Sequence, residues 1–237
     1  AEAGFMSMTG EPDGPPVRFG LSMVDFHTGS HMATALLAGL LGASRTGEGS
    51  DLDVCLFDTA LHQLSYPATW YLNQGHVTGR LPRGAHPSIA PSQLVKTKDG
   101  WGLLMCQTPK FWGLWCQLTG AELGEDPRFA TIPARRENLA ALSDAVDHVM
   151  MAKTTSEWLD VLGGNVPFAP VLDIGEALDS EYVAHVEMTT KVDHPEASQG
   201  VRTLASPFRI NGERPTLTRA PIMGEQSGDL LKQDTPV

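Results

Sequence analysis

The chain has 237 residues and a formal net charge of −11, and this acidic balance argues against duplex nucleic acid and anionic membrane as partners, since affinity for both comes from lysine and arginine. Its 24 glycines and 17 prolines together make up a larger share of the chain than the roughly 12% that is usual for these two residue types. This excess predicts a loop-rich fold rather than a helical bundle or coiled coil. No apolar run is long enough for a membrane-spanning helix, and no basic-then-apolar segment of a signal peptide opens the sequence.

The first 72 residues alternate predicted strands and helices. Val17–Val24 and Asp51–Phe57 show the apolar alternation of strands, whereas residues 30–45 carry apolar side chains at helical spacing with Ser30 as N-cap. Residues 58–72 return to the helical period. This order of strand, helix, strand, helix favours an α/β layer.

A segment rich in glycine and proline, residues 75–92, separates this part from a second group of elements. Residues 93–98 and 101–106 are predicted to pair as a hairpin. The helices predicted beyond it cover residues 110–118, 136–151, 156–162 and 175–185, with an extended segment at 166–171 and strand and loop from 188 onward. The aromatic cluster expected in the core of this part consists of Trp101, Phe111, Trp112 and Trp115.

Cysteines and histidines give no metal pattern. Cys55, Cys106 and Cys116 are an odd number at wide spacing, typical of reduced, mostly buried thiols in a cytoplasmic protein. His27 and His31 are four residues apart, a spacing that metal ligands use on a helix, but no HExxH pattern accompanies them and His27 is expected to precede the helix. We expect no metal site and no permanently bound cofactor.

Asp25 is the first candidate for chemistry. It is expected between a strand and the helix that begins near Ser30, where free N–H groups and the positive end of the helix dipole favour an ionised carboxylate. Such a carboxylate can attack an acyl carbon. Spacing alone favours the simpler alternative, in which Asp25 only caps the helix.

The loop at residues 86–91 (HPSIAP) is the second candidate, as a mobile active-site loop or as a plain linker. Its candidate substrate-contacting residues are His86, Ser88, Ile89 and Ala90. Gln107 and Thr108 interrupt the aromatic cluster with polar groups and form a candidate substrate pocket.

Seven stretches carry a resemblance when they are read together. They are Met6–Pro16 (MSMTGEPDGPP), Gly20–Gly29 (GLSMVDFHTG), Arg45–Asp58 (RTGEGSDLDVCLFD), Gly84–Pro91 (GAHPSIAP), Asp126–Thr131 (DPRFAT), Val166–Val171 (VPFAPV) and Asp193–Pro195 (DHP). Each alone is weak. In this order, over nearly the whole chain, they resemble the class III coenzyme A transferases, which include formyl-CoA:oxalate and carnitine CoA-transferases.

The resemblance implies an enzyme that moves CoA from an acyl-CoA donor to a small, typically dicarboxylic, acid. Asp25 matches the family nucleophile, which forms a mixed anhydride and then an aspartyl-CoA thioester, from which the acceptor acid takes the CoA. Loop 86–91 matches a segment that closes over the anhydride and limits its hydrolysis. The loop lacks the glycine run of the formyl-CoA enzymes, which argues against formate and oxalate as substrates.

The resemblance also implies an α/β fold with a Rossmann-like large domain, partial in this chain, and an inserted small α+β domain. The expected divisions are residues 1–58 (C-terminal portion of the large CoA-binding domain), 59–92 (linker helix and active-site loop), 93–186 (small domain) and 187–237 (return segment and tail). Family members form interlocked homodimers. Because the chain starts abruptly at Ala1, we expect it to lack an upstream half that carries most of the CoA site.

Two other functions stay open. Some family members are acyl-CoA racemases that move an α-proton between an aspartate and a histidine. Asp25 matches that aspartate, but the histidine would lie upstream, and Thr108 stands where racemases tend to carry glutamate. The other alternative is a non-catalytic fragment that needs a partner chain, against which a soluble, monomeric and folded 237-residue protein would speak.

Overall fold

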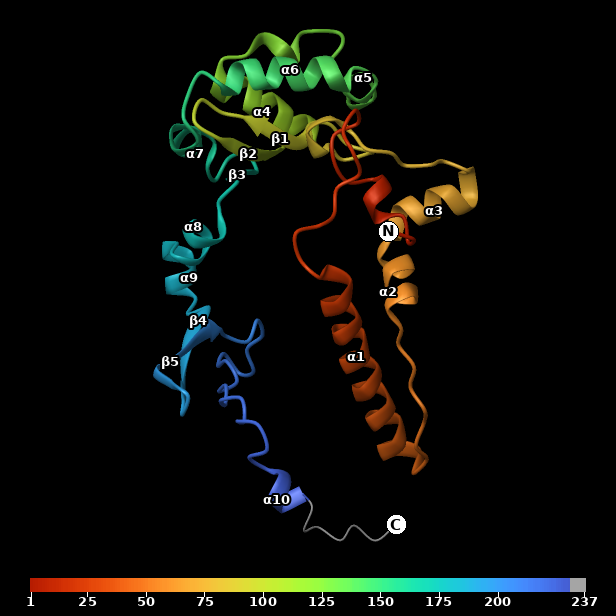
Figure 1. Cartoon of the computed structure of the whole chain (residues 1–237). Helices are drawn as coiled ribbons and strands as arrows, with labels where there is room; N and C mark the ends of the chain where they lie inside the picture. Colours follow the sequence, from red (N-terminus) through yellow and green to blue (C-terminus); the bar gives the residue numbers. More distant parts are fainter. Residues whose placement is uncertain (231–237) are drawn as a thin grey trace. The chain divides into compact units, whose positions relative to one another are not determined.

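A computed structural model describes residues 1–230 of the chain (Figure 1). These residues form two compact units, and the boundary along the chain lies between Val171 and Leu172. The four divisions expected from the sequence stay a prediction. The α-helices of the first unit are α1 (Met23–Thr46), α2 (Leu56–Gln63), α3 (Ser65–Gln74), α4 (Pro109–Thr119), α5 (Ile132–Glu137), α6 (Leu139–Met150) and α7 (Thr155–Leu162). Its three strands are β1 (Ser92–Lys96), β2 (Trp101–Met105) and β3 (Phe168–Pro170), and its 3-10 turns are η1 (Phe5–Ser7), η2 (Pro82–Gly84) and η3 (Glu122–Gly124).

An antiparallel sheet in the order β1-β2-β3 organises the core of the first unit. The predicted hairpin is confirmed, with Lys96 opposite Trp101 and Ser92 opposite Met105. Helix α6 contacts β1, and α7 contacts β3, so helices cover this sheet (Figure 1). Gly102 allows the close approach of β2 to β3, since a Cβ atom there would lie 2.2 Å from the Phe168 ring.

The core around this sheet is aromatic and fully closed. Trp115, Trp158 and Phe129 are almost inaccessible to solvent, and Trp112 stacks on Trp115 with ring centroids 5.2 Å apart. The indole of Trp158 donates to the Met150 carbonyl at 2.6 Å, which satisfies a polar group that burial would otherwise leave unpaired. Trp112 and Trp115 are therefore core residues, as predicted.

Trp101 departs from the prediction because it is 38% exposed. Along β2 the side chains alternate between the two faces, so Leu104 points into the core whereas Trp101 lies on the outer face. The Arg83 guanidinium lies over its ring, 5.5 Å from the centroid. Residues that form one aromatic cluster in the sequence therefore lie in two environments, because alternate side chains of a strand point to opposite faces.

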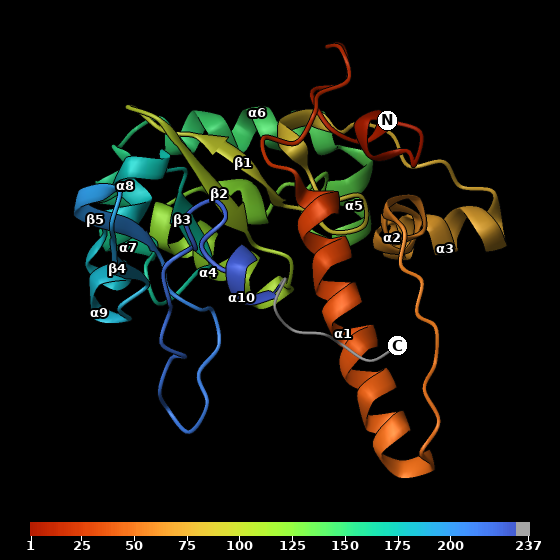
Figure 2. The same cartoon turned by 60° about the horizontal axis from the view of Figure 1, so that its bottom comes forward.

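The N-terminal part is helical, and the two predicted strands are wrong. Residues 17–22 and 51–55 have no strand neighbour among the described residues, and strands depend on hydrogen bonds to a neighbour. Figure 2 shows α1 as one long helix, with residues 47–55 returning beside it. Helices and two small antiparallel sheets give the α/β class expected from the sequence. The partial Rossmann-like domain and the inserted small domain stay predictions.

Helix boundaries also differ from the predictions. Helix α1 begins at Met23, well before Ser30, whose hydroxyl instead donates to the Phe26 carbonyl inside the helix. The helix predicted over 58–72 is broken between α2 and α3, where Ser65 has a φ of 51° and Pro67 has no N–H to continue the ladder.

Two other predicted helices are also divided. The helix over 136–151 becomes α5 and α6, because the Asn138 side chain donates to the Ala134 carbonyl and competes with the helix. The helix over 175–185 becomes α8 (Ile174–Leu178) and α9 (Glu181–His185), because Ser180 caps a new helix.

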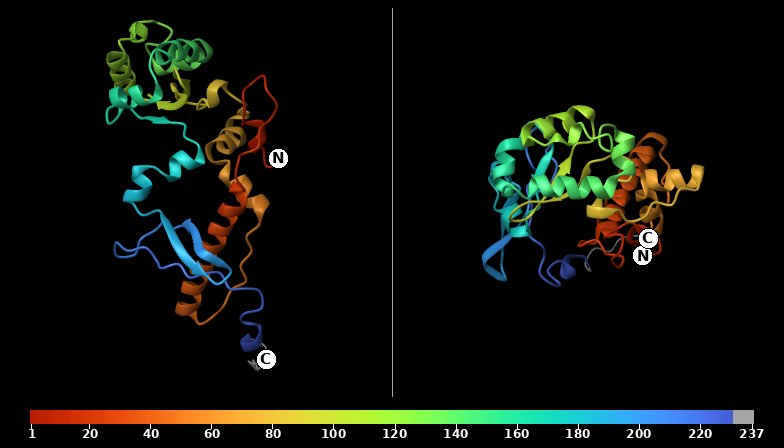
Figure 3. Two further views of the ribbon diagram at one scale, coloured as in Figure 1. Left: turned by 60° about the vertical axis from the view of Figure 1, so that its left-hand side comes forward. Right: turned by 90° about the horizontal axis from the view of Figure 1, so that it is seen from above.

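The second unit also contains a hairpin of β4 (Thr189–His194) and β5 (Ala197–Leu204), drawn in blue in Figure 3, and a short helix α10 (Ser227–Leu230). The strand-and-loop character predicted from residue 188 onward is confirmed up to residue 226, whereas residues 227–230 form helix α10. Over the described part of the chain, no helix combines the length and the apolar character needed to cross a membrane.

Candidate active site

Asp25 lies in the first turn of α1 and not between a strand and a helix. The N-cap is Ser22, so Asp25 is not the N-cap residue, although its carboxylate lies in the turn where negative charge stabilises a helix. Its carboxylate is exposed at the end of the helix where N–H groups have no helical acceptor and the dipole is positive. This position stabilises negative charge on an accessible carboxylate.

A cavity of about 370 Å³ opens beside Asp25. It is lined by the N-terminal segment and by residues 17–25, and Arg18 contributes a cation to its wall. Reasoning from the sequence missed Arg18, because nothing in its spacing marks it. Thr9 and Val17 also line the cavity, and a hydrogen bond from Val17 N–H to the Thr9 carbonyl at 3.1 Å closes the turn between them.

His86 opens the loop at residues 86–91 and is held through its backbone N–H and both ring nitrogens, with the Ser88 hydroxyl also 3.2 Å from Nδ1. Its backbone N–H donates to the Ser92 carbonyl at 2.9 Å, its Nδ1 accepts from Ser88 N–H at 3.2 Å, and its Nε2 lies 3.0 Å from the Tyr66 hydroxyl. Burial lowers the pKa of His86 below its usual value. A neutral ring whose Nδ1 accepts a hydrogen bond carries its proton on Nε2, which donates to Tyr66.

The two ends of the loop are held differently. The buried Arg135 donates from Nε to the Ala90 carbonyl at 2.7 Å and from Nη1 to the Phe129 carbonyl at 2.8 Å. The exposed Arg136 reaches only the Pro87 carbonyl, at 3.4 Å. The loop therefore has a firm end at Ala90 and a weakly held end at Pro87.

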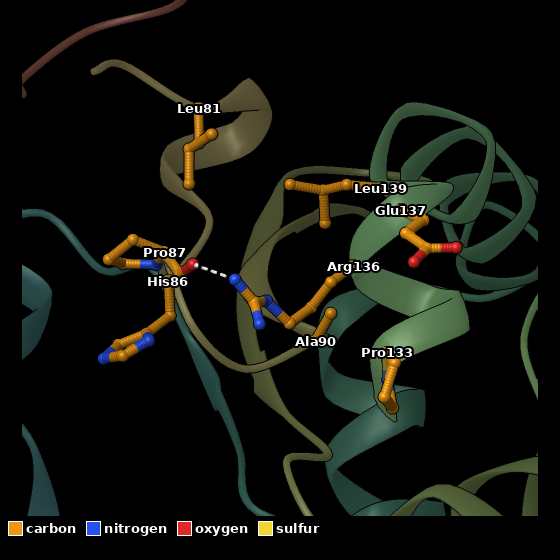
Figure 4. A pocket seen from close by; sticks show the side chains of 8 residues that line it. All are labelled: Leu81, His86, Pro87, Ala90, Pro133, Arg136, Glu137 and Leu139. Carbon is orange, nitrogen blue, oxygen red and sulfur yellow. Dashed lines mark hydrogen bonds between the residues drawn. The ribbon is translucent and has the colours of Figure 1, made fainter. Parts of the chain in front are cut away.

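A second cavity, of about 390 Å³, lies between this loop and α5 (Figure 4). Its lining residues are Leu81, His86, Pro87, Ala90, Pro133, Arg136, Glu137 and Leu139. Figure 4 shows Arg136 extending toward Pro87, whereas the Glu137 carboxylate points the other way. Arg136 has no carboxylate partner among residues 1–230, so its charge is available to an anionic ligand.

The other candidate residues lie apart from these cavities. The Thr108 hydroxyl accepts from Phe111 N–H at 3.2 Å and caps α4, and neither Thr108 nor Gln107 lines either cavity. Ser88 and Ile89 belong to the loop without lining its cavity. Asp25 and the loop line two cavities that share no residue.

Both candidate metal-ligand histidines lie on α1, so the expectation that His27 precedes the helix is wrong. His31 packs edge-on against His62, with ring centroids 5.7 Å apart. In residues 1–230 no group of three or more potential ligands is arranged to hold a metal ion.

Comparisons with a family model and with known proteins agree on one family. A family model described as CoA-transferase family III matches residues 1–227. An acetyl-CoA:oxalate CoA-transferase from Acetobacter aceti is 32% identical over 98% of this chain and 59% of its own length. A succinyl-CoA:glutarate CoA-transferase from Homo sapiens is 28% identical over 98% of this chain and 53% of its own length.

The same relationship holds for solved structures. A CAIB/BAIF family protein from Brucella suis superposes with a TM-score of 0.79 at 29% identity, covering 97% of this chain and 60% of that one. The chain therefore spans little more than half the length of the proteins it matches.

Proposed function

Because the chain belongs to CoA-transferase family III, we propose that the protein carrying it moves coenzyme A from an acyl-CoA donor to a small carboxylic acid. The observation that carries the proposal is the family match over residues 1–227. The exposed position of Asp25 in the first turn of α1, facing a cavity, supports it. The activity is that of the whole protein, since the chain covers 53–60% of the relatives above.

Asp25 acts as the nucleophile. A carboxylate oxygen attacks the thioester carbonyl, the carbon–sulfur bond breaks, and CoA leaves as a thiolate, which gives a mixed anhydride between Asp25 and the donor acid. The thiolate then attacks the Asp25 carbonyl and releases the donor acid, which leaves an aspartyl-CoA thioester. The acceptor carboxylate repeats the two steps in reverse and regenerates Asp25. No net proton transfer is required, so a carboxylate at a helix N-terminus suffices as the reacting group.

The acceptor class is a small dicarboxylic acid. The relatives named above act on oxalate or glutarate, both with two carboxylates. Arg136 offers, beside loop 86–91, a guanidinium that has no carboxylate partner among residues 1–230, and a guanidinium binds a carboxylate with two parallel hydrogen bonds. His86, Ser88, Ile89 and Ala90 shield the intermediates from water, and Gln107 and Thr108 stay candidates for the substrate pocket.

The assembly follows from the family resemblance. The protein is a cytoplasmic, interlocked homodimer whose CoA thioester is a substrate and not a resident cofactor. Residues outside this chain supply most of the CoA-binding groups.

Replacing Asp25 by Asn in the complete enzyme tests the proposal. Asp25→Asn is expected to lower CoA transfer by at least about a thousand-fold, because the amide is a poor nucleophile. Hydroxylamine added during turnover is expected to convert Asp25 of the wild-type enzyme to a hydroxamate, detected by peptide mass. Asp51→Asn, an exposed carboxylate on the loop after α1, is the matched control.

Full transfer by Asp25→Asn would contradict the proposal. Solvent deuterium at the α-carbon of the acyl-CoA, without transfer to an acceptor acid, would assign the racemase reaction instead.

A further inference from the structure

The turn between Thr9 and Val17, the two residues through which it reaches the Asp25 cavity, binds the side chain of Arg80. Arg80 donates from Nε to the Glu11 carbonyl at 3.0 Å and from Nη2 to the carbonyls of Pro12 and Gly14 at 3.2 and 3.1 Å. Three carbonyls of one turn therefore point at one guanidinium, whose rigid planar donors suit such a set.

Glycine at position 10 allows the turn to close on itself. Gly10 has a φ of +112°, and a Cβ atom there would lie 2.9 Å from Val17 and 3.1 Å from the Pro15 carbonyl oxygen. Glycine therefore permits the shape of the turn whose carbonyls bind Arg80.

A second contact joins the same turn to the chain before the loop. The Glu11 carboxylate accepts from the backbone N–H of Arg83 at 3.0 and 3.2 Å through its two oxygens. Arg83 has a φ of +58°, an uncommon conformation for a residue other than glycine. In this conformation the N–H group of Arg83 points at the Glu11 carboxylate, and the two hydrogen bonds stabilise the conformation.

The side chain of Arg83 continues the connection into the core. Its Nε and Nη2 atoms lie 3.0 and 2.9 Å from Oδ2 of Asp147 on α6. The other oxygen of Asp147 accepts from Lys96 N–H at 2.7 Å, so this largely buried carboxylate is fixed to strand β1 as well. A charge pair that is partly buried and fixed on both sides loses little side-chain entropy on pairing.

These contacts join the two cavities of the candidate active site. Thr9 and Val17, at the two ends of the turn, line the Asp25 cavity, and Leu81, between the two arginines, lines the cavity of loop 86–91. Resting on the proposed function, we propose that Arg80 and Arg83, with Glu11 and Asp147, form a clamp that positions the Asp25 segment relative to loop 86–91. The clamp residues are positioning residues, because none of them lines the Asp25 cavity.

The clamp has a consequence for the chemistry. Water that attacks the Asp25 anhydride or thioester regenerates the Asp25 carboxylate and releases the free acid or free CoA, which is hydrolysis in place of transfer. A loop held at a fixed position relative to Asp25 keeps water away from these intermediates and limits this reaction. Loss of the clamp therefore increases hydrolysis relative to transfer, which a merely stabilising role does not predict.

The test compares Arg80→Ala and Arg83→Ala with the wild type in the complete enzyme. The expected result is a fall in kcat for transfer of about ten- to a hundred-fold, with KM for acyl-CoA within about two-fold and a higher ratio of hydrolysis to transfer. Hydrogen exchange followed by mass spectrometry is expected to speed up in both residues 9–17 and residues 86–92. Arg128→Ala, which removes an exposed arginine whose carboxylate partner within residues 1–230 is Asp126, should match the wild type in all these measurements.

Arg80→Lys keeps the charge and separates positioning from folding, because it should unfold at the wild-type temperature and recover part of the transfer. A folded Arg80→Ala with an unchanged hydrolysis ratio, or with faster exchange only in residues 9–17, would overturn the clamp alone. Transfer retained by Asp25→Asn would overturn the proposed function and the positioning role with it.

Discussion

Residues 92–170 bury many of their large apolar side chains, whereas residues 1–84 leave many of theirs exposed. The first range buries Trp115, Trp158 and Leu142 completely. In the second, only the small residues Ala3, Thr59 and Ala60 are buried, and α1 carries Leu37 and Leu40 at 69% and 66% exposure.

The difference shows what helical spacing does and does not specify. Helix α1 has apolar residues at regular spacing, yet no residue of this 24-residue helix is buried. Spacing defines an apolar face, whereas burial requires a second surface that covers it. In residues 92–170 a three-stranded sheet and its helices supply that surface to each other.

Thiol reactivity should show the largest contrast between the two ranges. Burial, reinforced by the neighbouring Cys116, raises the pKa of Cys106 to about 12. At about pH 8 only about one Cys106 in ten thousand is then a thiolate, the form that reacts. Cys55 is exposed at the start of α2, so we expect it to react with iodoacetamide at least about a thousand times faster than Cys106. Peptide mass spectrometry after timed labelling measures both, and equal rates would contradict the burial of Cys106.

A matched pair of leucine substitutions tests the packing itself. Leu142→Ala in α6 should lower the free energy of unfolding by about 2–5 kcal/mol, because it leaves a cavity in a closed core. Leu40→Ala in α1 should change it by less than about 0.5 kcal/mol. Urea unfolding of the 237-residue chain measures both. A loss of the same size for Leu40→Ala would show that another surface covers this face of α1.

Neighbouring arginines on α5 give a smaller contrast within the core range. Arg135→Ala should lower the free energy of unfolding by about 2 kcal/mol, because the carbonyls of Ala90 and Phe129 lose a charged donor. Arg136→Ala, one residue later and exposed, should change it by less than about 0.5 kcal/mol. Thermal unfolding of the two variants side by side measures both losses. Equal losses would mean that the hydrogen bonds of Arg135 to the Ala90 and Phe129 carbonyls do not stabilise the fold.

The smallest effect concerns His86, where the two ranges meet. Burial lowers its pKa from the usual 6.5, so the closed loop disfavours protonation. An opened loop binds the proton more readily, so stability from this contact is present above about pH 6.5 and is lost as the pH falls below it. Hydrogen exchange in residues 86–92, corrected for its intrinsic pH dependence, should rise a few-fold between about pH 7.5 and 5.5.

His86→Gln, which does not titrate, is the control and should remove this rise. The charged and titratable groups around His86 are Tyr66, Arg136 and Glu137. A rise that persists in His86→Gln would assign the effect to one of them.

Local sequence signals predicted the elements of the core range well. The predicted hairpin depends only on near neighbours in the chain, namely the Lys98-Asp99-Gly100 turn and the strand alternation on each side of it. Helices α4 and α7 were predicted to within a residue or two for the same reason.

The errors came where the outcome depends on distant contacts. Residues 17–24 and 51–57 have the alternation of strands, but alternation cannot supply the neighbouring strand that a sheet needs. Arg80, Arg83 and Arg136 carry no local pattern, so their contacts with Glu11, Asp147 and Pro87 emerged only from the folded chain.

The sequence by itself determined the family, the candidate nucleophile Asp25 and the candidate loop 86–91, because ordered short motifs identify an ancestry and a chemistry. Only the tertiary structure decided that Asp25 lies within α1 and not before it, that His86 contacts Tyr66, and that Arg80 and Arg83 bind the Glu11 carbonyl and Asp147. The physical reason is that motifs record which groups are present. Which of them meet depends on hydrogen bonds and packing between residues 20 to 72 positions apart.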